Sequence, residues 1–222
     1  MARKGQPERT PTSELRLSRA SAARLSLYLR CLENWRRDGI ETVSSRQIAA
    51  TLGIQDAQVR KDLTPLGSLG QPGVGYRVAP LVAAIRQALG IDRTWVAVLV
   101  GVGNLARALL RYQGFRQQGF HIAALFDSDA SKVGQRVEGL EVLALGELPR
   151  KVRQSNAELG IITVPAEAAQ GVADLLLEAG IRGVLNFAPA VLRLPPAVRL
   201  VNVDLTIQLE QLAFQVQMGG SD

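Results

Sequence analysis

The chain has 222 residues, 47% hydrophobic and 21% charged, which is typical of a globular protein with one large or two small domains. No apolar run approaches the ~18–20 residues of a membrane span, and the polar first 21 residues lack the apolar core of a signal peptide. One Cys and one His exclude an intrachain disulfide and argue against a His/Cys metal site, so we expect a cytoplasmic protein without metal.

The net charge of +6 is concentrated in the first part of the chain. Residues 1–89 hold 14 Lys and Arg against 7 Asp and Glu, a charge of +7, whereas residues 90–222 hold 12 against 13, a charge of −1. This asymmetry favours contact with a polyanion such as nucleic acid, although a basic solvated surface without function would show the same charge. Residues 1–17 lack periodicity and are predicted to be a basic flexible tail.

A helix is predicted from the cap Ser18 to Asp38, because apolar residues recur in it at helical spacing. Cys31 lies on this apolar stretch, where we expect a small buried side chain. Ser44 and Gln47 predict a capping box at the start of a second, short helix.

The second short helix is expected to bury Leu52, and Asp56 is the expected cap of a third helix with Gln58, Arg60 and Lys61 on its exposed face. Two short helices joined by a Gly-containing turn are typical of a helix-turn-helix. Four glycines and a proline within residues 67–76 predict a β-hairpin, or wing. A linking helix over residues 81–89 completes a winged-helix DNA-binding domain at 18–89.

From residue 90 onward, strands and helices alternate, which predicts a Rossmann domain with a parallel sheet over residues 90–204. The apolar strand at 95–100 leads directly into a helix that runs through Tyr112. The loop between them has the dinucleotide fingerprint GxGxxA. Its glycines allow a tight turn and close approach of a pyrophosphate to the helix amides. The predicted phosphate-binding residues are Gly101, Val102, Gly103, Asn104, Leu105 and Ala106.

The second strand, at 120–126, ends in Asp127, 24 residues after Gly103. A carboxylate at this point holds the hydroxyls of an adenosine ribose and repels a 2′-phosphate, so NAD(H) is favoured over NADP(H). The alternative is a simple turn residue at a strand end. His121, inside the strand, is expected to be a packed core histidine.

A strand and loop are predicted at 159–165, followed by a helix to Ala179, then another strand and loop at 183–189 and a third strand at 198–203. Ligands bind beyond the carboxyl ends of such strands. Two of these ends are candidate walls for a nicotinamide, although Pro after a strand is also a common terminator; they comprise Thr163, Val164, Pro165, Asn186, Phe187, Ala188 and Pro189. A closing helix at 205–218 carries an apolar stripe that suits either core packing or a dimer seam.

In this order, the motifs resemble the Rex family of redox-sensing transcriptional repressors over residues 21–218. The resemblance rests on the following stretches: Arg24-Leu25, Tyr28-Leu29-Arg30, Val43-Ser44-Ser45, Gln58-Val59-Arg60-Lys61-Asp62-Leu63, Gly73-Val74-Gly75-Tyr76, residues 101–105, Phe126-Asp127, residues 163–170, residues 186–189 and Asn202-Val203-Asp204.

The resemblance implies a homodimer that binds double-stranded operator DNA when NADH is low, with NADH/NAD⁺ as effector and no enzyme activity. NADH would close the dimer and withdraw the winged helices, and the helix at 205–222 would be swapped between subunits. An interdomain switch is implied for Arg30, Tyr112 and Asp204. The implied DNA-binding residues lie at the start of the second helix, on the third (recognition) helix and in the wing. They are Ser44, Ser45, Arg46, Gln58, Arg60, Lys61, Gly73, Gly75 and Tyr76.

The chain departs from the family pattern at three places. Thr64-Pro65-Leu66-Gly67 stands where the family usually has Ser-Tyr-Phe-Gly, and Gln71-Pro72 where the wing often has Lys or Arg. Both leave the operator sequence and the wing contacts open. Ala106 replaces the third glycine of the fingerprint, which does not threaten cofactor binding.

Two rival functions explain part of the pattern. An NAD-dependent oxidoreductase would account for the fingerprint and Asp127, but not for the basic helix-turn-helix, and the only His lies within a strand rather than beside a candidate acid. A CoA-binding Rossmann module also uses glycine-rich loops, but Asp127 suits a ribose that is free of phosphate.

Overall fold

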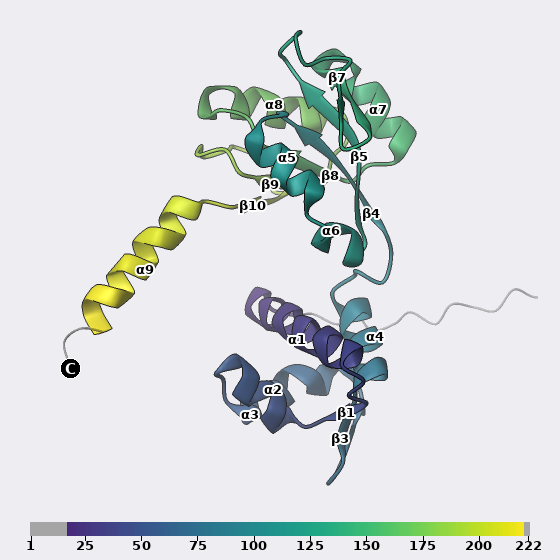
Figure 1. The fold of residues 1–222 in the computed structure, drawn as a ribbon, viewed down its shortest axis with the longest axis vertical. Helices are drawn as coiled ribbons and strands as arrows, with labels where there is room; N and C mark the ends of the chain where they lie inside the picture. The colour runs from purple at the N-terminus through teal and green to yellow at the C-terminus, as the bar shows by residue number, and fades with distance from the viewer. Residues whose placement is uncertain (1–16, 220–222) are drawn as a thin grey trace, which may run out of the picture. The chain divides into compact units, whose positions relative to one another are not determined.

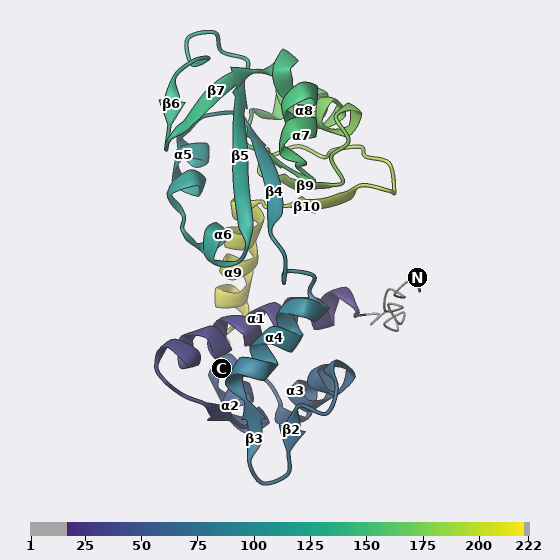
Figure 2. The same ribbon diagram turned by 90° about the vertical axis from the view of Figure 1, so that its right-hand side faces the viewer.

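A computed structural model describes residues 17–219, which divide into two compact units, one ending at Arg93 and one beginning at Thr94 (Figures 1 and 2). The predicted basic tail at 1–17 lies, apart from Leu17, outside the described residues, as do residues 220–222.

The first unit is the predicted winged helix, with three helices, a linking helix and a small antiparallel sheet of order β1-β3-β2. Its elements are α1 (Arg19–Arg37), β1 (Thr42–Val43), α2 (Ser45–Leu52), α3 (Asp56–Leu63), a 3₁₀ turn η1 (Thr64–Leu66), β2 (Gly70–Gln71), β3 (Gly75–Arg77) and α4 (Val78–Ala88). The linking helix α4 begins three residues before the predicted start.

The helix starts follow from their caps. Ser18 accepts a hydrogen bond from the backbone N–H of Ser21, and the predicted capping box between Ser44 and Gln47 is confirmed. The expectation that Asp56 caps α3 was wrong. The N-cap is Gln55, which makes no side-chain cap, and Asp56 lies inside the first turn with its carboxylate bonded to Arg60.

The wing turns at Pro72-Gly73, where Gly73 has a φ of 76° and Val74 N–H donates to the Gln71 carbonyl at 3.1 Å. Gly75, with a φ of 100°, allows a close approach, because a Cβ there would lie 2.4 Å from the Val43 carbonyl oxygen. Glycine at 75 therefore holds the wing against β1.

The core of the first unit lies between α1, α4 and the helix-turn-helix. Its buried residues are Leu25, Tyr28, Leu29, Leu32, Val43, Ile48, Ala49, Val59, Leu63, Val78, Leu81, Val82 and Ile85. Leu52 and Cys31, both expected to be buried, are only half-buried. Burial still raises the pKa of the Cys31 thiol.

The second unit is a seven-stranded sheet of order β10-β9-β8-β4-β5-β7-β6, parallel except for the β6–β7 pair. Its elements are β4 (Trp95–Val100), α5 (Asn104–Arg111), α6 (Gly114–Gln117), β5 (Phe120–Asp127), β6 (Arg136–Val137), β7 (Leu140–Ala144), the 3₁₀ turn η2 (Leu145–Glu147), α7 (Leu148–Ser155), β8 (Leu159–Ile162), α8 (Ala166–Glu178), β9 (Gly183–Asn186), β10 (Arg199–Asn202) and α9 (Leu205–Gly219). The strand order reverses between β4 and β8, the place where such sheets bind ligands.

Helices α5 and α6 lie on one face of this sheet, and α7 and α8 on the other (Figure 2). The larger apolar cluster is on the α7–α8 face, where Phe126, Leu148 and Leu176 are fully buried. His121 is exposed, so the expectation of a core histidine was wrong. It lies at the beginning of β5, before the buried end of the strand.

The closing helix α9 is apolar but exposed along its length. Leu209, Phe214 and Val216 are 66%, 62% and 69% exposed. Of the two readings of its apolar stripe, packing into the core of its own chain is therefore wrong.

Candidate functional site

The phosphate loop leaves β4 at Gly101, which has a φ of 96° and donates its N–H to the Phe126 carbonyl at 2.8 Å. A Cβ here would lie 2.6 Å from Val164 Cγ1 and 2.7 Å from the Thr163 carbonyl oxygen. Only glycine lets the loop turn this closely against the end of β8.

The N-terminus of α5 is open for a ligand. Its N-cap, Gly103, makes no side-chain cap, and a Cβ at Gly103 would meet nothing within 4 Å. Ala106 is fully buried and packs the helix on the sheet, whereas Asn104 and Leu105 are exposed. Uncapped amides and the positive end of the helix dipole suit the pyrophosphate of a dinucleotide.

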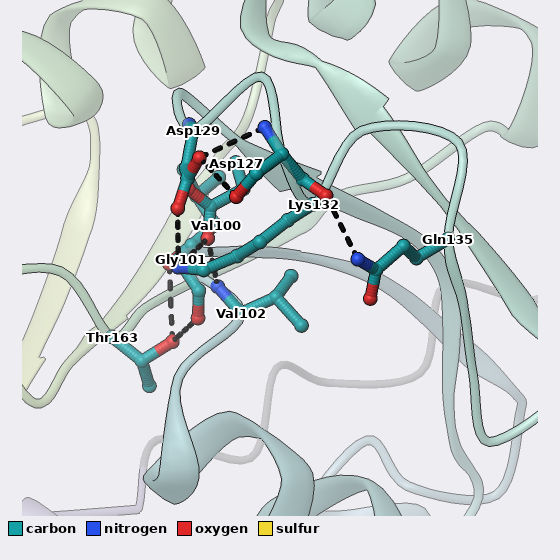
Figure 3. Close-up of polar contacts among 9 residues, drawn as sticks. Val100, Gly101, Val102, Asp127, Asp129, Lys132, Gln135 and Thr163 are labelled. Carbon is teal, nitrogen blue, oxygen red and sulfur yellow. Dashed lines mark hydrogen bonds and ion pairs between the residues drawn. The ribbon is translucent and has the colours of Figure 1, made fainter.

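Asp127 ends β5 beside this loop and is buried (Figure 3). Its Oδ2 accepts from Val102 N–H at 2.7 Å and from Lys132 Nζ at 3.0 Å, and its Oδ1 accepts from Asp129 N–H at 2.9 Å. Burial alone would raise the pKa of Asp127, but these donors hold it below the ordinary value.

A carboxylate has about four acceptor positions, and the three donors leave one on Oδ1 for a ribose hydroxyl. The alternative reading of Asp127 as a simple turn residue is incomplete, because its carboxylate also fixes the phosphate loop through Val102.

A cavity of about 770 Å³ joins these groups across the point where the strand order reverses. Its lining comprises Val100, Gly101, Val102, Gly103, Asp127, Ser128, Asp129, Lys132, Leu145, Thr163, Val164, Pro165, Ala168, Gly171, Val172 and Leu175. Thr163 Oγ1 donates to the carbonyls of Val100 and Gly101 at 3.1 and 2.7 Å, which ties the end of β8 to the phosphate loop (Figure 3).

Asn186 is the last residue of β9 and residues 187–189 follow it, and all four lie outside the lining of this cavity. Asn186 is buried and organises the loop, since its Nδ2 donates to the Ala188 and Ala190 carbonyls and to Asn202 Oδ1, and its Oδ1 accepts from Ala188 N–H. Phe187 packs partly on the apolar α5 face, and Pro189 is exposed.

The three residues implied as a switch occupy different environments. Arg30 is exposed on α1. Tyr112 is 54% exposed, and its ring meets Phe115 edge-on at 5.4 Å. Asp204 caps α9, accepting from the N–H groups of Thr206 and Ile207 at 2.9 and 3.3 Å.

The candidate DNA face surrounds a cavity of about 680 Å³ between the wing and the starts of α2 and α3. Its lining comprises Ser44, Ser45, Arg46, Asp56, Arg60 and residues 70–76, which brings together most of the implied DNA-binding set. Lys61 is exposed outside this lining. Gln58 is half-buried, because its Nε2 donates to Asp62 Oδ1 at 3.1 Å.

Asp62, which motif reasoning did not assign a role, is the buried centre of a polar network between α1 and α3. It accepts from Arg24 Nε and Nη2 at 2.6 and 2.7 Å and from Tyr28 Oη at 2.8 Å. Burial would raise the pKa of Asp62, yet Arg24 and Tyr28 hold it low. Asp62 in turn raises the pKa of Arg24, and burial together with Asp62 raises that of Tyr28.

Within residues 17–219, no helix is long and apolar enough to cross a membrane, and no group of three His, Cys, Asp or Glu could hold a metal ion. A winged helix joined in one chain to a dinucleotide-type Rossmann unit defines a ligand-responsive transcription regulator.

Comparisons identify the family. Residues 16–64 match the model "Putative DNA-binding protein N-terminus" and residues 92–190 the model "CoA binding domain". The redox-sensing transcriptional repressor Rex of Carboxydothermus hydrogenoformans is 48% identical over 91% of this chain and 97% of its own length, and that of Desulforamulus reducens 45% over 92% and 97%.

A solved structure of RSP in complex with β-NAD⁺ and operator DNA has a TM-score of 0.86 and 31% identity, over 92% of this chain and 94% of that one. RSP in complex with β-NADH has a TM-score of 0.83 and 30% identity, over 92% and 96%. The chain belongs to the Rex family of redox-sensing transcriptional repressors.

Proposed function

We propose that this chain is a homodimeric repressor that binds operator DNA when NADH is scarce and leaves it when NADH binds. The observation that carries the proposal is the union of a basic winged helix with an uncapped helix N-terminus beside the ionised Asp127. The structures of RSP in complex with NAD⁺ and operator DNA and in complex with NADH support the proposal that this chain binds both a dinucleotide and DNA. Such a repressor acts beside the chromosome, in the cytoplasm.

In this proposal, residues 101–106 hold the pyrophosphate and Asp127 holds the adenosine ribose. Thr163, Val164 and Pro165, which line the cavity, form one wall for the nicotinamide, and residues 186–189, beyond the cavity at the end of the neighbouring strand β9, form another. The nicotinamide loses its positive charge on reduction, so apolar walls such as Val164 and Phe187 favour the reduced form. Only such differential binding can shift a conformational equilibrium.

On the DNA face, we assign base and phosphate contacts to Arg60, Lys61 and Arg46, with Ser44, Ser45 and the wing residues Gly73, Gly75 and Tyr76 beside them. We assign Gln58 to the same face, where its half-buried side chain is oriented by the hydrogen bond from its Nε2 to Asp62. An Arg on a recognition helix discriminates bases by about 1–3 kcal/mol, whereas phosphate contacts supply salt-dependent affinity.

We assign dimer formation to α9, swapped onto a second copy. Its exposed apolar side chains need a partner, and the second unit offers an apolar groove of about 290 Å³ on the sheet. The groove is lined by Ala97, Phe115, Phe120, Ile122, Leu159, Gly160, Ile161, Gly183, Val184, Leu185, Arg199 and Val201. For the switch that the family resemblance implies, we propose that Asp204 bonds to Arg30 when NADH is bound and to Tyr112 when DNA is bound.

We also propose that the chain is not an enzyme and neither oxidises nor reduces the dinucleotide that it binds. The charged groups that line the cavity, Asp127, Asp129 and Lys132, are bonded to one another at the ribose end. An oxidoreductase would oxidise NADH with a carbonyl substrate, which absorbance at 340 nm would detect. Competition between NADH and CoA in a binding titration separates the CoA-binding alternative.

The test is a gel-shift titration of the full chain on a palindromic duplex selected in vitro, with NADH and NAD⁺ added in turn. We expect NADH to release the duplex at much lower concentration than NAD⁺. Equal concentrations of the two, or no selected duplex at all, would contradict the proposal.

A further inference from the structure

The recognition helix α3 carries an acid on its DNA face that the function above does not use. Asp56 in the first turn accepts a hydrogen bond from Arg60 Nη1 at 2.5 Å, and the side chains are 37% and 54% exposed. The same Nη1 lies 3.4 Å from Ser45 Oγ at the start of α2. The guanidinium is therefore held between the two helices of the helix-turn-helix.

This arrangement leaves a particular edge of Arg60 free. Among residues 17–219, its side-chain hydrogen bonds are made through Nη1. The Nε–Nη2 edge presents two parallel N–H groups, the fork that pairs with O6 and N7 of guanine. An arginine fixed by one nitrogen can read a base with the other two without leaving its acid.

A phosphate contact would behave differently. Asp56 remains ionised, since its bond to Arg60 lowers the pKa of its carboxyl. If Arg60 swung away to a phosphate, a bare carboxylate would remain on the rim of the cavity that faces the polyanion. Binding through the backbone alone is therefore disfavoured by repulsion, whereas base reading with the pair intact is not.

We propose that Asp56 is a specificity-determining residue of the DNA-binding face, which holds Arg60 for base reading and disfavours complexes that use phosphates alone. The inference rests on the proposed DNA-binding function. It differs from a role in helix stability, because an acid in the first turn of α3 would stabilise the helix equally on any DNA.

The experiment compares the full-length parent with Asp56→Asn, which keeps an oxygen acceptor for Arg60 but removes the charge. Affinity is measured by fluorescence anisotropy on the duplex selected for the parent and on a scrambled duplex of equal length, over a range of salt concentrations. We expect the scrambled duplex to gain most, so that the specificity ratio falls about fivefold, the low end of what one bidentate arginine contributes. The slope of log affinity against log salt on the scrambled duplex should steepen by about 0.9.

Two variants serve as controls. Asp38→Asn removes the same charge from an exposed acid at the C-cap of α1 and should leave the ratio unchanged. Asp56→Glu restores the charge and should recover the parent ratio.

The proposal is overturned if Asp56→Asn keeps the parent ratio, if both duplexes gain equally, or if Asp38→Asn reproduces the effect. A parent that selects no duplex would instead remove the proposed function, and the inference with it.

Discussion

The buried network around Asp62 allows a quantitative prediction about the DNA-binding unit. Asp62→Ala removes the acceptor of Arg24, Tyr28 and Gln58 at once. Tyr28 is fully buried, so its hydroxyl cannot turn to water, and an unsatisfied buried hydroxyl costs about 1–3 kcal/mol. With the loss of the ion pair, we expect the unit to be destabilised by about 2–4 kcal/mol.

The assay is urea unfolding followed by tryptophan fluorescence. The chain has two tryptophans, Trp35 in the first unit and Trp95 in the second. In a Trp95→Phe background, Trp35 reports the first unit alone. Tyr28→Phe leaves Asp62 its other donors and should cost about 1 kcal/mol, whereas Asp38→Asn should stay within about 0.5 kcal/mol.

The pH dependence follows from the low pKa of Asp62 in the folded unit. A carboxyl whose pKa is depressed by folding stabilises the protein above its unfolded pKa of about 3.9, and this contribution is lost as the pH falls through the folded value. The stability of the parent should therefore fall on acidification below about pH 4–5, and Asp62→Ala should flatten that fall. The reasoning would be refuted if Asp62→Ala lowered the free energy of unfolding by less than about 1 kcal/mol. It would also be refuted if the stability of Asp62→Ala fell with acid as steeply as that of the parent.

Three further predictions concern the effector site and the switch. Asp127→Ser should weaken NADH and relax the bias against NADPH in calorimetric titrations, and unchanged affinities for both would show that Asp127 does not hold the ribose. Gly101→Ala, with its Cβ against Val164 and Thr163 at a positive φ, should destabilise the second unit by at least about 2 kcal/mol in thermal unfolding; a neutral result would mean that the loop relaxes freely. Arg30→Ala should bind NADH in titrations but stay on the duplex at NADH concentrations that release the parent, and release at the parent concentration would exclude Arg30 from the switch.

Much of the fold follows from local signals in the sequence. The capping box at Ser44, the wing glycines and the apolar strand before Gly101 each determine a conformation within a few residues, and each lies where expected. Residues 128–158 yielded no prediction, yet they form β6, β7 and α7. Strands β6 and β7 are short, so an alternation of period 2 is not prominent in them. In α7 the buried Leu148 and Val152 do lie at helical spacing, but two apolar positions in a charged helix of 8 residues are too few to identify it from the sequence.

The residues of the candidate sites also fall into those that local motifs predict and those that they do not. A fingerprint reveals the residues that must be small or acidic, such as Gly101 and Asp127. It does not reveal their partners, because Lys132 and Asp129 reach Asp127 through a loop without periodicity. The role of Asp62 could not be predicted from the sequence for a similar reason, since its partner Arg24 lies 38 residues away on another helix.

The basic excess of the first 89 residues locates the DNA-binding unit but not its binding face. Arg24 is half-buried and paired with the buried Asp62, and Arg86 is paired with Glu33 at 2.8 Å between α4 and α1. These cations stabilise the fold and do not offer a free charge to a phosphate. Arg60 is paired as well, but with an acid on the surface and with two of its nitrogens still available. The same kind of ion pair therefore withdraws Arg24 from the surface, because its partner Asp62 is buried, whereas in our proposal the exposed pair with Asp56 orients Arg60 toward the bases.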